Sequence, residues 1–149
     1  MEKERIQFYR KWHGKPLDDY CTVVSPEYKS FQRCFMNCLK RIADDLGARL
    51  AWFHPNHYDE TAMLERDGKF CYVSHSNNHI RGRSTPVLHG MLLRSAAHEK
   101  DYHGGPNQYA DWADLTNRID RILGGKGEIE DKELFPQRQQ YPLAYQDRS

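Results

Sequence analysis

Four histidines stand where two expected strands end, and histidine side chains can bind a divalent metal or transfer protons. They are His54, His57, His75 and His79. The strands expected over residues 48–54 and 69–75 run in the same direction in a meander, so their ends share one edge of the sheet. With Tyr58, Asp59 and Glu60 nearby, this edge predicts a zinc-type metal site. The same spacings also arise by chance in a chain with eight histidines, whose loop histidines would face water.

No recognised catalytic motif accompanies these histidines. The chain lacks HExxH, GxxxxGK[ST], GxGxxG and GxSxG. A metal-assisted hydrolase or nuclease that uses the histidine cluster is therefore kept as the alternative, and a non-enzymatic protein without a cofactor is favoured.

A second group of residues suits an anion. Arg81 and Arg83 precede an expected helix start at Thr85 and Pro86, where free N–H groups attract negative charge. A phosphate backbone or an acidic protein surface would fit, although two loop arginines are usually just solvated. Tyr72, in the third expected strand, could stack a base if it is exposed.

A third group lies in residues 84–107, which carry the start and stop signals of a helix. Arg94, His98 and Asp101 follow one another at spacings of four and three, which are within reach on a helix surface. We expect an ionic network in which one carboxylate holds two cations. A ligand-binding or catalytic trio is the alternative.

The helices and strands that we expect to position these residues together form an α+β fold. We expect helices over residues 2–12, 26–46, 86–103 and 112–123, and strands over residues 48–54, 60–66 and 69–75. Asp67 and Gly68 indicate a two-residue hairpin turn. The prediction is a three-stranded antiparallel meander packed against three to four helices, in the order α-α-β-β-β-α-α and in two layers.

One domain is expected over residues 1–125, in which residues 1–24 form the N-terminal helix and its connection. Residues 126–149 have no sustained period and are expected to form an extended or disordered arm, with Phe135, Tyr141 and Tyr145 able to dock.

Composition narrows the class of protein. The chain has 149 residues, a net charge of +1, and 38% hydrophobic and 29% charged residues, which suits a single domain and disfavours a wholly nucleic-acid-binding surface. It has no apolar run that could span a bilayer and no signal-peptide core at its start, so we expect a cytoplasmic protein. Its four cysteines lack CxxC spacing and are expected to be core residues.

Three segments carry a resemblance to a family. They are SPEYKSF, ERDGKFCYVSHSN and LLRSAAHEKDYHGGPNQYADWADLTNRIDRIL, within residues 25–123. They resemble small, largely uncharacterised accessory proteins of conjugative elements and phages of gut Firmicutes. This resemblance implies a role as an inhibitor of host defence, such as an anti-CRISPR or anti-restriction protein, and transfers no catalytic residue.

The leading hypothesis is therefore a non-enzymatic binding protein of a mobile genetic element, which inhibits a defence nuclease by occupying a surface. We expect a protein partner, such as a nuclease effector complex, with nucleic acid as the alternative through Arg81 and Arg83.

Overall fold

The computed structural model describes residues 2–12, 26–56, 59–76, 79–80, 83–84 and 91–129. Its helices are α1 (Glu2–Trp12), α2 (Pro26–Asp45) and α3 (Trp112–Ile122). Its strands are β1 (Arg49–Pro55), β2 (Asp59–Arg66), β3 (Lys69–Ser76), β4 (His79–Ile80), β5 (Arg83–Ser84), β6 (Met91–Ala96) and β7 (Gln108–Ala110).

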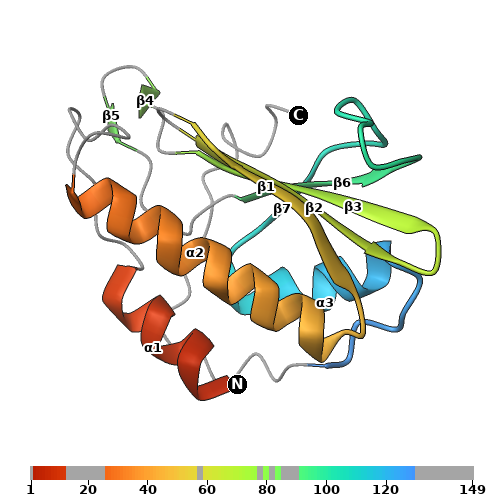
Figure 1. Ribbon diagram of the computed structural model, residues 1–149, viewed down its shortest axis with the longest axis horizontal. Helices are drawn as coiled ribbons and strands as arrows, with labels where there is room; N and C mark the ends of the chain where they lie inside the picture. Colours follow the sequence, from red (N-terminus) through yellow and green to blue (C-terminus); the bar gives the residue numbers. More distant parts are fainter. Residues whose placement is uncertain are drawn as a thin grey trace.

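One antiparallel sheet of five strands forms the centre of the fold. Its order is β1-β2-β3-β6-β7, and the short strands β4 and β5 form a separate two-stranded sheet. All three helices lie on the same side of the five-stranded sheet (Figure 1). The α+β class and the two layers are as predicted, but the sheet has two more strands than the expected meander.

The core fills the space between the helices and one face of the sheet. From α2 come Phe31 and Phe35, whose ring centroids lie 5.6 Å apart. Leu64 and Val73 approach them from the sheet, and Trp112 of α3 is buried against Phe35. The predicted core role of cysteines is confirmed for Cys38 and Cys71, which are buried free thiols, while Cys34 is half-buried and Cys21 lies outside the described residues.

Local sequence signals explain the confirmed boundaries. The helix α2 begins at Pro26 and is followed by Gly47 in a left-handed conformation (φ 64°), which suits a helix end. At the hairpin between β2 and β3, Asp67 and Gly68 both have positive φ, as a type I′ turn requires. The side chain of Glu65 accepts a hydrogen bond from the Gly68 N–H, which holds this turn.

The helix predicted over residues 86–103 is wrong for its described part. Residues 91–96 form β6, which pairs with β3 on one side and β7 on the other. The run of apolar residues suits a strand as well as a helix, because Met91 and Leu93 then face the core together. Pairing with β3 also satisfies the backbone of that strand, which would otherwise be an open edge. Residues 97–107 form a loop, so the expected order α-α-β-β-β-α-α does not hold.

An arginine at the end of β2 joins the ends of two helices. Arg66 Nη1 donates to the Leu46 carbonyl after α2 and to Asp120 Oδ1 in α3, at 2.9 and 2.8 Å. Its Nη2 donates to the carbonyl oxygens of Asp120 and Leu123. These carbonyls belong to the last turns of helices, which lack partners within the helix. The guanidinium group therefore supplies donors to both helix ends at once.

Residues 126–129 pack against α3, although the sequence placed them in the C-terminal arm. The N–H of Gly127 donates to Asp120 Oδ2, and that of Ile129 donates to Asn117 Oδ1. The rest of the expected arm lies outside the described residues. Within the described part of the chain, no helix combines the length and the apolar character needed to cross a membrane.

Candidate functional site

The face of the sheet opposite the helices carries a group of aromatic and basic side chains, and we call this the open face. Alternation along the strands places Leu50, Phe53, Leu64 and Val73 in the core. The side chains that alternate with these core residues along each strand, such as Trp52, Met63 and Tyr72, lie on the open face. The open-face cluster is defined as Trp52, His54, Tyr72, Arg94 and Tyr102.

A β-bulge in β1 puts Trp52 on this face. The pairing of β1 with β2 shifts between Leu50 and Trp52, so Ala51 is the extra residue. Trp52 consequently lies opposite Met63, and Met63 lies opposite Tyr72 on the next strand. Met63 is fully buried although it points away from the helices, because the aromatic residues beside it cover the open face at this point.

Trp52 is the centre of the cluster. Its ring stacks on His54 with centroids 4.4 Å apart and planes at 16°. The ring of Tyr72 lies 6.2 Å away and that of Tyr102 lies 5.6 Å away, both tilted. Such tilted and stacked arrangements are the favoured geometries of aromatic pairs. His54 is exposed and Tyr102 is 47% exposed, so two rings of the cluster face solvent.

Arg94 of β6 forms the basic part of the cluster. Its guanidinium carbon lies 5.5 Å from the ring centroid of Tyr72, which is a cation–π distance. Its Nε donates to Asn107 Oδ1, and its Nη1 donates to the Tyr102 carbonyl at 2.8 Å. Both acceptors are neutral, so they orient the guanidinium group without neutralising it. Burial raises the pKa of the Tyr72 phenol above its ordinary value.

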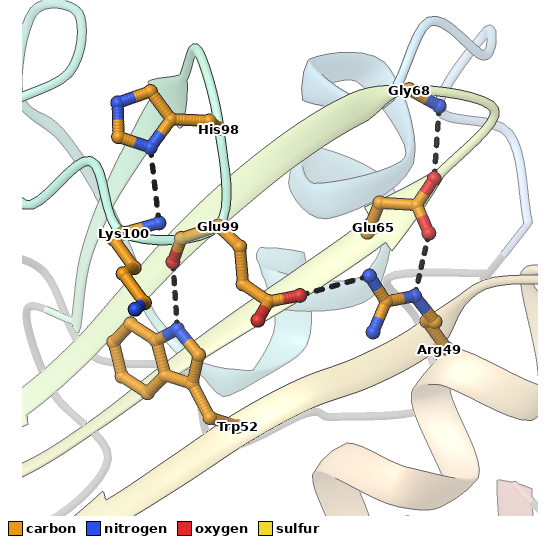
Figure 2. Close-up of polar contacts among 7 residues, drawn as sticks. All are labelled: Arg49, Trp52, Glu65, Gly68, His98, Glu99 and Lys100. Carbon is orange, nitrogen blue, oxygen red and sulfur yellow. Dashed lines mark hydrogen bonds and ion pairs between the residues drawn. The ribbon is translucent and has the colours of Figure 1, made fainter.

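Residues 97–107 form a loop that reaches over the open face. The indole Nε1 of Trp52 donates to the Glu99 carbonyl at 2.7 Å, as Figure 2 shows. Arg49 bridges Glu65 of β2 and Glu99 of the loop at 2.7 and 3.0 Å. The pKa of Glu65 is lowered, first by the Gly68 N–H and then by Arg49. These contacts attach the loop to β1 and β2, beside Trp52.

Asp101 holds the loop in shape from within. Its carboxylate accepts hydrogen bonds from the N–H groups of Ala97, His103 and Gly104, at 2.9 to 3.1 Å. These bonds, with Ala97 first, lower the pKa of Asp101 to about 2. Gly104 has φ 32°, and a Cβ there would collide with the Ser95 carbonyl oxygen, so a glycine fits this close approach.

The expected helix-borne network of Arg94, His98 and Asp101 is wrong in its geometry. Arg94 lies on a strand and is bound to Asn107 and Tyr102, whereas Asp101 binds backbone N–H groups of its own loop. His98 Nδ1 accepts from the Lys100 N–H (Figure 2). Among the residues that the structure describes, no carboxylate therefore holds Arg94 and His98 together.

The predicted histidine site is divided between the two faces of the sheet. His54 is on the open face, while His75 is 1% exposed on the core face and lies 2.8 Å from Glu60 through Nδ1. The two cannot bind one metal ion across the sheet. His57 lies outside the described residues, and for His79 only the backbone of β4 is described. Over the described ranges no group of metal-binding side chains is found.

Glu60 and His75 instead form a buried polar cluster with Gln32 of α2. The Gln32 amide donates to Glu60 Oε1 at 2.9 Å and to the Asn56 carbonyl. His75 packs beside the rings of both Phe31 and Phe35, with centroids 5.0 and 5.5 Å away. Glu60 is fully buried, so this cluster joins α2 to the sheet rather than meeting a ligand on the surface.

The remaining candidates divide as follows. Arg81 lies outside the described residues, and Arg83 is described only as backbone in β5, so the predicted anion site at the Pro86 helix start is not placed. Tyr72 is on the open face and belongs to the cluster. Sequence reasoning missed Trp52 and Tyr102, although Trp52 and His54 are two residues apart, which is a strand signal for one shared face.

A second concave region lies between α1 and α2. It has a volume of about 270 Å³ and is lined by residues that include Phe8, Trp12, Cys34 and Cys38. Gln7, Lys11 and Asn37 also border it, but the surface that it exposes is almost entirely apolar, whereas a ligand site usually has a few polar groups that orient the ligand. The open-face cluster, which combines rings with a fixed cation, is the stronger candidate site.

Comparisons of this chain with family models, with curated proteins and with solved structures find no match.

Proposed function

We propose that this protein is a non-enzymatic binding protein whose partner contacts the open-face cluster. The observation that carries the proposal is the continuous group of rings and guanidinium around Trp52, on a face that none of the described helices covers (Figure 1). Tryptophan, tyrosine and arginine are the residues that contribute most binding energy at interfaces. Here they are already held by packing and hydrogen bonds, so binding requires little further ordering of their side chains.

The role as an inhibitor of a defence nuclease of the host is part of this proposal and derives from the resemblance alone. An inhibitor of this kind acts by covering a surface of the nuclease or the nucleic acid that the nuclease must reach, and it requires no catalytic group. The rigid open face is suited to that task because the loop over it is attached at Glu99 and braced by Asp101.

A plasmid-interference assay tests the proposal. Cells with an active nuclease defence receive the parent protein, a His54→Ala/Tyr102→Ala variant, or a Lys29→Ala/Lys40→Ala control from the exposed side of α2. We expect the parent and the control to protect the plasmid equally. The cluster variant should protect it at least tenfold less than the parent.

Two outcomes contradict the proposal. Protection by none of the proteins, across the defence systems tried, removes the inhibitor role. Equal protection by the cluster variant and the parent removes the open face as the contact surface. Thermal melts of the three proteins must agree, since both pairs of substitutions replace exposed side chains.

A further inference from the structure

We infer that the ligand of the open-face cluster is single-stranded nucleic acid, with bases stacked on exposed rings and phosphates bound by Arg94 and Lys100. This inference rests on the proposed function, because it names the class of partner for the same face.

The first support is a stack of rings that ends in solvent. His54 lies nearly parallel to Trp52, and within the described part of the chain its only ring contact is with Trp52. The outer face of the imidazole is therefore open to a third flat ring. An unpaired base has such a ring, and stacking on aromatic side chains is how single strands bind without sequence preference. Tyr102, 47% exposed beside Trp52, offers a second platform.

The second support is the state of the cations. Arg94 makes its two hydrogen bonds to neutral oxygens, and its Nη2 donates to no group among the described residues. Lys100 is exposed, and its ammonium group forms no ion pair within the described ranges. Both cations can therefore take a phosphate oxygen without breaking an existing ion pair.

The third support is the state of the carboxylates on this face. Glu65 and Glu99 are bound by Arg49, and Asp101 is bound by three backbone N–H groups. Asp59, which alternation along β2 also places on this face, accepts a hydrogen bond from the Asn56 amide. Their charges are partly compensated by these donors, whereas those of Arg94 and Lys100 are not. The local charge pattern is thus complementary to an anion beside an aromatic surface.

The same pattern disfavours a duplex. A duplex hides the faces of its bases and is bound mainly through many phosphate contacts. Two cations and a net charge of +1 supply few such contacts. An unpaired strand gains from stacking as well, so the cluster should select single strands over duplexes.

The inference is tested by fluorescence anisotropy with labelled oligonucleotides of about twelve nucleotides, a length within the usual site sizes. The set comprises single-stranded DNA, single-stranded RNA, a duplex of the same sequence and a free mononucleotide. We expect the parent to bind a single strand of at least one kind, DNA or RNA, at least tenfold more tightly than duplex or mononucleotide. The logarithm of the affinity should fall with the logarithm of salt at a slope of about 0.7 per phosphate contact, so near 1.4 for two cations.

Variants then assign the contacts. We expect His54→Ala and Tyr102→Ala to weaken binding at least about fivefold each. Lys100→Gln, which removes an exposed charge without disturbing packing, should lower the salt slope by about 0.7. Lys40→Gln, on the exposed side of α2, is the matched control and should leave affinity and slope unchanged.

Three results overturn the inference: no binding of any single strand at low salt, equal affinity for duplex, or binding that survives both ring substitutions. Failure here is separable from failure of the proposed function. If oligonucleotides do not bind but the His54→Ala/Tyr102→Ala variant still loses plasmid protection, the open face remains the contact surface and its partner is a protein.

Discussion

Replacing Arg66 by methionine should destabilise the fold more than any replacement of an exposed arginine. Arg66 makes four hydrogen bonds that join the ends of α2 and α3, and the Asp120 side chain that it pairs with is only 6% exposed. Removing one partner of a buried ion pair costs roughly 3–5 kcal/mol. Arg66 retains 18% exposure and Asp120 keeps the Gly127 N–H, so we expect the lower end, about 3 kcal/mol.

Urea denaturation followed by circular dichroism measures this loss of unfolding free energy. For a chain of this size, the melting temperature should fall by roughly 10 °C. The matched control is Arg49→Met. Arg49 also bridges two acceptors, but its side chain is 55% exposed, so solvent screens its ion pairs and little change is expected. Equal losses for the two variants would refute the reasoning that burial of the guanidinium decides its contribution.

Three further predictions follow from the polar contacts. Glu60→Ala should destabilise by roughly 3 kcal/mol in the same assay, because it removes the shared acceptor of two buried donors; an unchanged midpoint would contradict the buried cluster. The lowered pKa of Asp101 means that the stabilisation contributed by its carboxylate is fully present above about pH 4 and is lost as the pH falls through about 2. Trp52 emission in the parent should change over that range, and Asp101→Asn should abolish the change; persistence of the transition in the variant counts against this assignment. Gly104→Ala should displace the loop from Ser95 and shift Trp52 emission at neutral pH, and an unshifted spectrum would show that the loop tolerates a side chain there.

Local signals were sufficient for most of the fold. Pro26 and Gly47 delimit a helix, and Asp67-Gly68 fixes a hairpin, because each of these depends on backbone conformations that few residues adopt. Residues 91–96 could not be assigned in this way. Their apolar run fits both periods, and the strand is selected by pairing with β3, a contact between segments that are distant in sequence.

The candidate site depended on a feature that the sequence does not display. Without the β-bulge, Ala51 would pair with Met63, and strict pairing from Leu50 onward would place His54 opposite Glu60, on the core face with His75. The β-bulge shifts His54 to the open face and brings Trp52 with it. One extra residue thus separates His54 from His75 and creates the stacked pair of Trp52 and His54 at the centre of the open-face cluster.

The intrinsic fluorescence of Trp52 tests the central claim most directly, because Trp12 and Trp112 are buried at 2% and 1% exposure on the other side of the sheet. The protein is titrated with single-stranded oligonucleotide, or with any nuclease against which the plasmid-interference assay shows protection, while binding is followed independently by anisotropy of a labelled component. If the partner contacts the open-face cluster, tryptophan emission changes saturably with the same midpoint as binding, and Trp52→Phe removes the emission change. Binding that leaves the emission of the parent protein unchanged would contradict the assignment of the open face as the contact surface.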